Sequence, residues 1–584
     1  PFTIQLDSFR IAYYPGTEAP ADYISYITYS LPGQKNVLLH EQISMNRIFT
    51  SQGFRFYQSS FDDDGKGSWL TVNYDPWGTG VTYAGYILLG LSMIWLLFSR
   101  SSDFRRLLNH PLLKKGGVFI LFIFCLAGNM QAQKKLLPAL KRTQADSLAQ
   151  EQVIYHDRVV PFNTLARDFI QKLTGEASYK GLTPEQVIGG WLLYPEVWRN
   201  EPLIYIKNTE LQHLLNLQTP YARLTDLFDG SVYRLREHWQ CEQGQQSKLA
   251  KAIQETDEKV GLILMLEKGT FIQPLPTDGS VQPLSELEVK AELLYNRIPF
   301  SKILFMINLS LGVLSFLLLL HNSLQRNTLS PKAKTISRTA GTFFSVALYL
   351  AFIFHLAGYC LRWYIGGRVP LSNGYETMQF MALCILLIAC LLHRRFSFIL
   401  PFGFLLSGFA LLVSYLGQMN PQITPLMPVL VSPWLSIHVS LIMMSYALLA
   451  FIMLNGILAL CLRKKESENN VSGNDAVQDN RIEQLTLVSR LLLYPATFFL
   501  GAGIFLGAVW ANVSWGRYWA WDPKEVWALI TFLVYGVAFH SQSLRIFRKP
   551  LFFHIYMILA FLTVLMTYFG VNYVLGGMHS YANS

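Results

Sequence analysis

Four tryptophans are crowded into one short stretch of the chain, which reads WGRYWAWDPKEVWALIT from Trp515 to Thr531. Indole rings offer wide apolar faces with a polar N–H at the edge, which suits a flat, mainly apolar ligand that also carries charge. An aromatic belt at the membrane surface is the alternative interpretation, although belt tryptophans are usually spread over several helices. The density of rings and charges favours a ligand platform. Its residues are Trp515, Trp519, Trp521, Trp527, Arg517, Asp522, Lys524 and Glu525.

A helix start is encoded inside this stretch. Asp522, Pro523 and Glu525 are of the residue types preferred at the N-cap, the first helical position and the third. The spacing predicts a helix that begins at Pro523 and continues through apolar residues to His540. At 1.5 Å per residue, His540 would lie about 25 Å along the helix, most of a hydrocarbon core of about 30 Å. One ligand in one pose cannot contact both His540 and the tryptophans.

The composition is that of a polytopic membrane protein, because 51% of the 584 residues are hydrophobic and 15% are charged. The basic residues behind the net charge of +10 fall in short loops between apolar runs, which argues against nucleic-acid binding. None of the six cysteines forms a Cys-x-x-Cys pair, so neither a disulfide framework nor a zinc site is indicated. We expect a polytopic α-helical membrane protein of about ten transmembrane helices with extracytoplasmic β-rich and mainly helical soluble domains.

Changes in composition divide the chain into four parts. Residues 1–80 alternate polar and apolar side chains between Gly and Asp clusters, which predicts short β-strands. Residues 81–130 contain two apolar runs, and residues 131–302 form a polar, mainly helical insertion. Residues 303–584 contain eight further apolar runs. The polar segment 463–487 between two of these runs is expected to be a disordered linker.

Lys and Arg are distributed unevenly over the loops between apolar runs. One alternating set of loops holds nineteen of them and the opposite set holds four. Because the richer loops face the cytoplasm, the tryptophan stretch, both soluble domains and the C-terminus are predicted to lie outside. His321 and His393 begin basic loops of the cytoplasmic set, and both are expected to be solvated.

Three histidines stand out by their depth. His438 begins an apolar run and His579 follows the last one, so both share the outer face with the tryptophans. Two imidazoles on separate elements beside an aromatic platform suit axial ligation of a heme iron, while an interfacial hydrogen-bonding role stays open for either alone. His540 lies near the opposite face, where a functional role and a snorkelling or bundle-facing role are both open.

The sequence resembles a known family of heme-handling membrane proteins. The tryptophan stretch, within a loop at 510–531, looks like their "WWD" signature. RWYIGGRVPLSNGYETMQF (362–380) and GGMHSYA (576–582) are similar to the CcsA/ResC-like half of that family. NRIFTSQGFRFYQSSFD (46–62) and VNYDPWG (72–78) resemble its ResB-like half. In this order the motifs resemble a fused ResB–CcsA protein (CcsBA), a System II cytochrome c synthase.

This resemblance implies an activity. Such proteins export heme b (iron protoporphyrin IX) across the bacterial inner (cytoplasmic) membrane. As cytochrome c heme lyases, they join its vinyl groups by thioether bonds to the thiols of a Cys-x-x-Cys-His (CxxCH) motif in apocytochrome c. His438 and His579 would be the outer axial ligands and central to catalysis. His540 would be one of two histidines that hold heme within the membrane.

The remaining heme contacts implied by the resemblance come from the tryptophan stretch, with Arg517 and Lys524 suited to the propionates or to interfacial snorkelling. Expected partners are apocytochrome c, membrane lipid and thiol-reducing proteins, with no nucleic acid. The second membrane histidine belongs to an N-terminal region, which we expect to be missing because no first span precedes the soluble opening at Pro1. Phe532 departs from the family signature, where another Trp is frequent. The platform contacts are Trp515, Trp519, Trp521, Asp522, Trp527 and Arg517.

Three other functions share parts of this pattern. A heme transporter or chaperone that makes no covalent bond would have the same loop and histidines, but large outer domains favour a protein that receives apocytochrome c. A membrane electron-transfer cytochrome usually pairs its histidines at similar depth in neighbouring spans. A membrane glycosyltransferase would need acidic residues clustered outside, whereas the visible acids are a helix cap and scattered loop charges.

Overall fold

The computed structural model divides the chain into two compact units. The membrane unit consists of Pro1–Ala12, Pro20–Ile120 and Pro299–Ser584, and the inserted unit consists of Tyr13–Ala19 and Leu121–Ile298. The structure describes residues 3–13, 20–30, 38–62, 64–99, 101–113, 137–230, 232–236, 247–277, 279, 281–324, 331–416, 421–426, 428–462 and 474–575.

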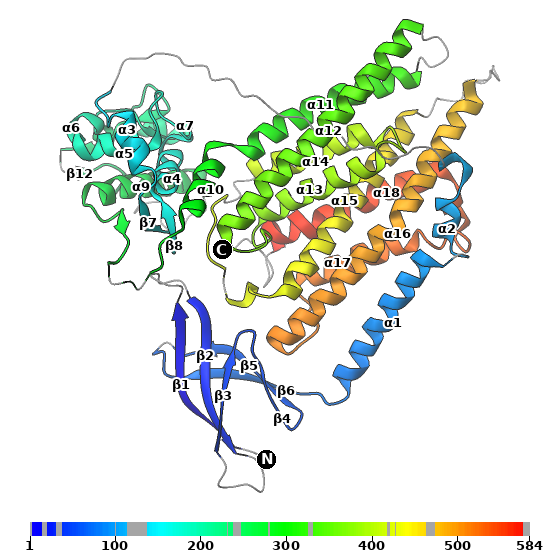
Figure 1. Ribbon diagram of the computed structural model, residues 1–584, viewed down its shortest axis with the longest axis horizontal. Helices are drawn as coiled ribbons and strands as arrows, with labels where there is room; N and C mark the ends of the chain where they lie inside the picture. The colour runs from blue at the N-terminus through cyan, green and yellow to red at the C-terminus, as the bar shows by residue number, and fades with distance from the viewer. Residues whose placement is uncertain are drawn as a thin grey trace. The chain divides into compact units, whose positions relative to one another are not determined.

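Two three-stranded sheets open the membrane unit, in the orders β1-β2-β3 and β4-β5-β6 (Figure 1). Their inward side chains share a small core of Ile27, Ile43, Phe49 and Phe56. The β-rich character predicted for the start of the chain is therefore confirmed. The strands are β1 (Thr3–Tyr13), β2 (Pro20–Ser30), β3 (Leu38–Ser44), β4 (Phe49–Ser51), β5 (Phe54–Phe61) and β6 (Ser68–Tyr74).

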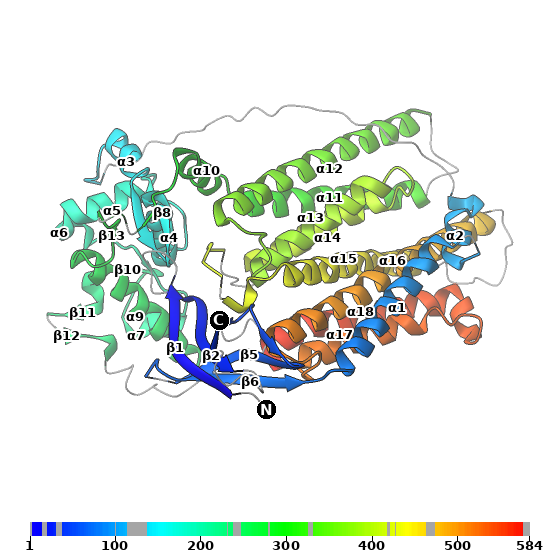
Figure 2. The ribbon, with the colours of Figure 1, turned by 60° about the horizontal axis from the view of Figure 1, so that its bottom comes forward.

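The rest of the membrane unit is a bundle of long apolar helices that run side by side (Figures 1 and 2). Among the described residues, seven helices are long and apolar enough to cross a membrane, and α14 and α17 are shorter. The chain is thus a multi-pass membrane protein, as predicted, and the apolar run at 117–130 lies outside the described residues. The helices are α1 (Gly78–Phe98), α2 (Asp103–Leu108), α11 (Phe300–Leu324), α12 (Pro331–Gly366), α13 (Gly374–Leu392), α14 (Ile399–Leu416), α15 (Pro433–Leu462), α16 (Asn474–Trp515), α17 (Pro523–Val537) and α18 (Pro550–Leu565), with the π-helix η5 (Met566–Leu575).

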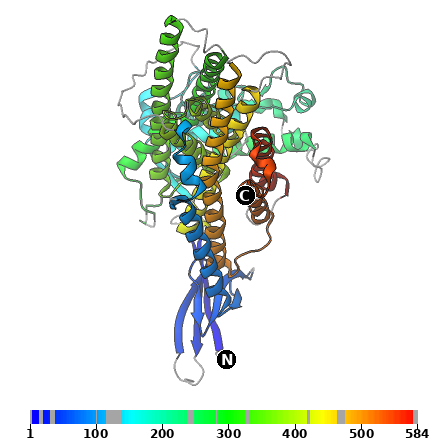
Figure 3. The same ribbon diagram turned by 90° about the vertical axis from the view of Figure 1, so that its right-hand side faces the viewer.

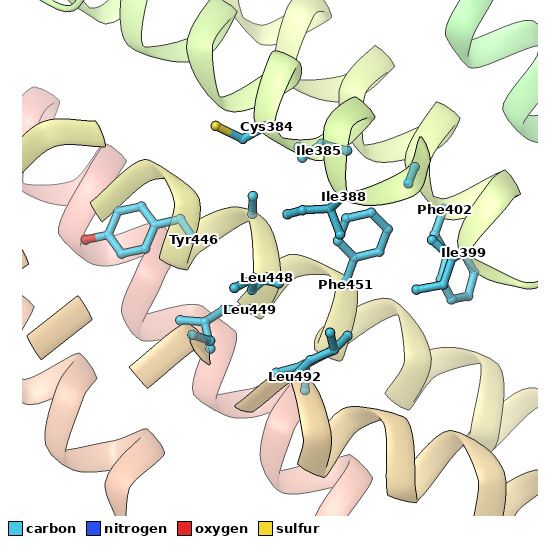
Figure 4. Close-up of a cluster of buried hydrophobic side chains, with 14 of the residues drawn as sticks. Cys384, Ile385, Ile388, Ile399, Phe402, Tyr446, Leu448, Leu449, Phe451 and Leu492 are labelled. Atoms are coloured by element: carbon cyan, nitrogen blue, oxygen red, sulfur yellow. The ribbon is translucent and has the colours of Figure 1, made fainter. Parts of the chain in front are cut away.

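The core of the bundle is a continuous cluster of apolar side chains from α13, α14, α15 and α16 (Figure 4). Ile388, Phe402 and Phe451 lie together at its centre. Close packing rather than removal from water holds such helices together, because lipid tails are as apolar as the side chains. Small residues permit the approach: a Cβ added at Gly403 would lie 2.3 Å from the Cβ of Ala389.

Two helix ends differ from the sequence predictions. The helix that begins at Pro523 ends at Val537, so the prediction that it reaches His540 is wrong. The amides of residues 538 to 540 bond three residues back, which tightens the last turn as in a 3₁₀-helix. The predicted linker at 463–487 is also wrong from residue 474 onward, because α16 begins at Asn474. Residues 474–487 contain no Gly or Pro, so nothing in their composition prevents a helix although many of them are polar.

The inserted unit is mainly helical, as predicted, and packs around the buried side chains of Phe169, Trp191 and Trp198. The helix expected over 162–173 is α4. The helices are α3 (Arg142–Leu148), α4 (Phe162–Thr174), α5 (Pro184–Leu193), α6 (Pro195–Trp198), α7 (Thr209–Leu214), α9 (Lys248–Glu267) and α10 (Glu286–Arg297). The strands are β7 (Gln152–Tyr155), β8 (Arg158–Pro161), β9 (Ile204–Tyr205), β10 (Tyr221–Ala222), β11 (Phe228–Asp229), β12 (Val232–Tyr233) and β13 (Gln273–Pro274).

Candidate functional site

The start of α17 has the cap that its sequence predicts. The Asp522 carboxylate accepts from the backbone N–H of Lys524 at 2.9 Å. The Glu525 carboxylate accepts from the backbone N–H groups of Ala520 at 2.8 Å and of Asp522 at 3.3 Å. Two carboxylates thus satisfy amides at the positive end of the helix dipole. Asp522 is 5% exposed, so its main structural role is to fix the loop to the helix.

The tryptophans form two edge-to-face ring pairs at the end of α16 and in the loop after it. The ring centroids of Trp510 and Trp515 are 4.8 Å apart, and those of Trp519 and Trp521 are 6.2 Å apart. Trp521 is 75% exposed and has a φ of 56°. A bulky residue in this left-handed region is strained by roughly 1–3 kcal/mol, and such strain is concentrated at functional sites. Trp527 is half-buried on the first turns of α17.

His438, near the start of α15, packs its imidazole against α16. Its Nδ1 lies 2.6 Å from the carbonyl oxygen of Gly503, and a Cβ added at Gly507 would lie 2.7 Å from the ring. A carbonyl only accepts, so Nδ1 carries the hydrogen, and Nε2 of the neutral ring carries the lone pair. Metal-binding histidines have this arrangement, in which the second nitrogen donates to a carbonyl. Gly507 precedes Trp510 by about one helical turn, so the imidazole lies near the level of that tryptophan.

The N-terminal sheets contact the tryptophan loop, which the sequence patterns did not predict. Asn73, on β6, donates from Nδ2 to the carbonyl oxygen of Gly516 at 2.6 Å. Tyr57, on β5, is 1% exposed, and a Cβ added at Gly516 would lie 2.6 Å from its ring. Gly516 has a φ of 74°, so both its conformation and its surroundings require a residue without a side chain. Burial raises the pKa of the Tyr57 phenol, which therefore stays neutral in this contact.

The N-terminal sheet region also contacts the segment that leads into α15. Asn46 donates from Nδ2 to the carbonyl oxygens of Pro428 at 2.8 Å and Val431 at 3.0 Å. Helix α1 lies beside α16 (Figure 3), and its Tyr83 accepts through the hydroxyl from Nδ2 of Asn512 at 3.0 Å. Both ResB-like sequence segments therefore supply side chains that hold the loops at the tryptophan ends of α15 and α16.

A buried ion cluster fixes the turn between α12 and α13. Glu376 is 1% exposed, and its carboxylate accepts from Arg362 Nη2 at 2.8 Å and from Arg368 Nη1 at 2.9 Å. Ser372 adds its backbone N–H at 2.9 Å and its hydroxyl at 2.8 Å. Arg362 Nη1 also donates to the carbonyl oxygen of Pro421 at 2.7 Å. The charged residues of the CcsA-like motif thus brace the turn against the chain that leads toward α15.

The other candidate residues are not gathered at one point. His579 lies outside the described residues. His540 is exposed and follows the end of α17, so that helix separates it from the tryptophans. Arg517 is exposed in the loop, and Lys524 donates from Nζ to Oδ1 of Asn572 at 3.1 Å.

A bare metal ion has no evident site in the described part of the chain, where no three His, Cys, Asp or Glu side chains are grouped to hold one. A heme needs protein ligands only at its axial positions, together with apolar walls. The imidazole of His438 would be suited to one axial position, and the indoles of the tryptophan loop are apolar surfaces of the kind that such walls need. The described residues therefore fit a heme better than a bare metal ion.

Known proteins share both halves of this chain. Residues 1–104 match the ResB-like family, and residues 371–579 match the family described as cytochrome C assembly protein. Protein NrfI of Wolinella succinogenes is 32% identical over 658 aligned positions, which cover 100% of this chain and 71% of NrfI. The cytochrome c biogenesis protein CcsA of Chlamydomonas reinhardtii is 38% identical over 232 positions, which cover 38% of this chain and 63% of that protein. CcsA of Prochlorococcus marinus (strain MIT 9301) is 34% identical over 246 positions, which cover 38% of this chain and 78% of that protein. The chain belongs to the fused ResB–CcsA family of System II cytochrome c biogenesis proteins.

Proposed function

We propose that this protein exports heme and attaches it covalently to apocytochrome c beside the tryptophan loop. The observation that carries the proposal is the imidazole of His438, fixed through Nδ1 on the Gly503 carbonyl at 2.6 Å near the level of Trp510. Its Nε2 has the lone pair that an iron ligand needs, and the loop offers aromatic faces to a porphyrin such as heme b. By resemblance to the family, His579 supplies the opposite axial ligand.

The proposed reaction asks this chain to hold and orient its substrates rather than to supply a nucleophile. Each thiol of the CxxCH motif adds across one vinyl group, so that sulfur bonds to the carbon next to the porphyrin and the proton goes to the terminal carbon. The atoms balance without an oxidant, and the thiolates belong to apocytochrome c. Positioning of the vinyl groups and exclusion of water are then the contributions of the loop and of His438. The histidine of the incoming motif would displace one protein imidazole and so release the product.

Heme would reach this site from the cytoplasm by way of His540, across the bacterial inner membrane. Helix α17 has 15 residues, so about 22 Å separate its capped start from its end near His540. The orientation rests on the nineteen-to-four distribution of Lys and Arg. A reporter fused after Ser584 should show external character, and one inserted near Asp475 should show cytoplasmic character. Reversed readings at both points would reject the orientation.

Reconstitution with apocytochrome c tests the covalent activity directly. The wild-type protein should yield heme that stays on the cytochrome in a denaturing gel and has the pyridine hemochrome spectrum of a thioether-linked heme. His438→Ala should abolish this product and change the heme spectrum, and added imidazole should restore part of both. His321→Ala, at the exposed end of α11, is the matched control. Tightly bound heme with no covalent product in the wild-type protein would favour the transporter or chaperone function.

His540 needs a different measurement, because a relay residue and a structural residue both lower the final yield. A relay role predicts less heme per molecule of purified His540→Ala protein, with the ligands of the outer site unchanged. A structural role predicts low membrane abundance with normal heme per surviving molecule. A normal heme ratio together with normal attachment would eliminate the relay.

A further inference from the structure

A cavity of about 700 Å³ opens at the end of the bundle opposite the tryptophan loop. It lies between the last turns of α11 and α15, the first turns of α12 and α16, and the turn from α13 to α14. Leu485, in its wall, precedes Gly507 by 22 residues on α16, which corresponds to about 33 Å along the helix. The cavity is therefore about one hydrocarbon thickness from His438 and belongs to a different site.

The lining of this cavity is amphipathic and basic. Arg338, Arg394 and Arg481 contribute three guanidinium groups, and the described lining residues include no Asp or Glu. Guanidinium groups bind carboxylates and phosphates in a planar, two-point geometry. The apolar part of the wall can cover a hydrocarbon body of matching size. Its residues are Leu318, Leu319, Phe344, Phe398, Leu400, Leu458 and Leu462.

His393, which also lines the cavity, has a buried nitrogen with an unused lone pair. The sequence predicted a solvated side chain, but His393 is only 5% exposed. Its Nδ1 lies 3.1 Å from the carbonyl oxygen of Ala389 and 3.2 Å from that of Cys390, so Nδ1 carries the hydrogen. The buried Nε2 has no hydrogen-bond partner among the described residues. Burial lowers the pKa of His393, which keeps the ring neutral and the lone pair available.

An unsatisfied buried acceptor is costly, so a water molecule or a bound group must complete His393 Nε2 in the cavity. A molecule that fills the cavity needs an acidic group that can pair with the arginines and an apolar body that can pack against the wall. It also needs either a metal-like electron-pair acceptor or a hydrogen-bond donor for His393 Nε2. A metalloporphyrin with carboxylate side chains has all three. An anionic phospholipid such as phosphatidylglycerol has the acid and the apolar body, and its headgroup hydroxyls can donate a hydrogen to Nε2, but it has no electron-pair acceptor that could bind this nitrogen as a metal does.

We propose that this cavity is a loading vestibule for heme, in which the arginines hold the propionates and His393 Nε2 binds the iron before the heme moves on. The proposal rests on the proposed function, because it takes the cargo to be heme. It assigns the basic end of the bundle a binding step distinct from both His540 and His438.

The test measures protection of one position in the cavity wall by a bound molecule. Ser397 lines the cavity and is exposed, so Ser397→Cys gives a thiol whose maleimide labelling can be followed by peptide mass spectrometry. The full chain is placed in phosphatidylcholine nanodiscs, and hemin or metal-free protoporphyrin IX is added. In a separate arm, phosphatidylglycerol replaces the neutral lipid. Ser101→Cys, exposed in the turn before α2, is the control thiol.

Hemin should slow labelling at position 397 and leave position 101 unaffected. His393→Gln should raise the hemin concentration for half-protection about tenfold and leave protection by metal-free protoporphyrin unchanged, because only the iron contact is lost. Arg338→Gln with Arg481→Gln should weaken protection by both porphyrins a few-fold, in the range of partly exposed ion pairs. Arg106→Gln, an exposed arginine on α2 outside the cavity, should change neither.

Three outcomes would overturn the vestibule. Phosphatidylglycerol that protects position 397 while hemin adds nothing would assign the cavity to lipid. Equal protection by hemin in the wild-type and His393→Gln proteins would show that His393 does not bind the iron. No protection by any molecule, with normal heme attachment in the same preparation, would reject the vestibule and leave the proposed function standing. Protection of position 397 by hemin without any covalent attachment would support the vestibule and reject the proposed attachment activity.

Discussion

Gly507→Ala should disable the site without altering any side chain that contacts heme. The added Cβ would lie 2.7 Å from Cε1 and 2.8 Å from Nδ1 of His438, whereas ordinary contacts begin at 3.4 Å. The imidazole must therefore retreat by about 0.7 Å, which would lengthen its 2.6 Å bond to the Gly503 carbonyl to as much as about 3.3 Å and weaken it. Ligand geometry tolerates only about 0.5 Å, and a shift of about 1 Å can cost 10²-fold in rate. We expect heme attachment to fall between about 10-fold and 100-fold.

Protein stability should hardly change in this variant. The weakened hydrogen bond costs at most about 0.5–1.5 kcal/mol, and replacing a helical Gly by Ala returns up to about 1 kcal/mol. The assay pairs the absorption spectrum and heme content of purified protein with the rate of thioether formation and a thermal melt. Gly536→Ala is the matched control, because a Cβ added there meets nothing within 4 Å. It should raise the melting temperature slightly and leave the heme spectrum unchanged.

A wild-type spectrum and attachment rate in Gly507→Ala would refute the reasoning, since the displaced imidazole could then not be an iron ligand. A large fall in melting temperature for Gly507→Ala alone would show instead that the glycine serves helix packing. Free imidazole should not rescue Gly507→Ala, because the native ring still occupies the space. The same addition should partly rescue His438→Ala, in which that space is empty.

Three further changes test separate parts of the site. Glu376→Gln leaves the buried Arg362 and the partly buried Arg368 without a counter-charge and should cost about 3–5 kcal/mol, seen as low membrane abundance and a lowered melting temperature. Glu286→Gln, at an exposed position of α10, should change neither, and equal losses in both variants would contradict a buried cluster. Asn73→Ala removes the donor to the Gly516 carbonyl and should lower the free energy of unfolding by about 0.5–1.5 kcal/mol. Limited proteolysis should then cut the tryptophan loop faster. An unchanged cleavage rate would show that the loop keeps its conformation without this hydrogen bond. Trp521→Gly should relieve the strain of the positive φ and raise the free energy of unfolding by about 1 kcal/mol. Heme attachment should nevertheless fall, because the indole ring is lost. Full heme attachment in this variant would show that the ring has no function.

Local rules predicted the features that depend on neighbouring residues. The Asp522–Pro523–Glu525 spacing gave the capped start of α17, and hydropathy placed the long helices of the bundle. Hydropathy reports how much of a helix is apolar, however, and not where the helix ends. Helix α16 therefore extends to Asn474 through polar residues, and α17 stops at Val537 although Ala538 and Phe539 continue the apolar run.

Contacts between distant segments left no local signal. Asn46 and Pro428 are 382 positions apart, and Asn73 and Gly516 are 443 positions apart. An asparagine in a strand looks the same in sequence whether it faces water or a backbone carbonyl. His393 was assigned to solvent because its loop is basic, but the neighbouring helices bury it. Burial of a polar group is set by what packs against it, so only the tertiary structure reveals these residues.

The long-range contacts join the ResB-like and CcsA-like parts into one compact unit. The tryptophan loop contains two residues at positive φ, Gly516 and Trp521, so it carries a conformation that the loop alone would not favour. Asn73 and Tyr57 compensate at Gly516, and Asn46 holds the segment before α15 from the same part of the chain. The helix that carries His438 and the helix that ends in the tryptophan loop are thereby tied to one pair of sheets. Anchoring both helix ends to the same sheets helps to fix the distance between the imidazole and the indoles, and a ligand bound between them would depend on that distance.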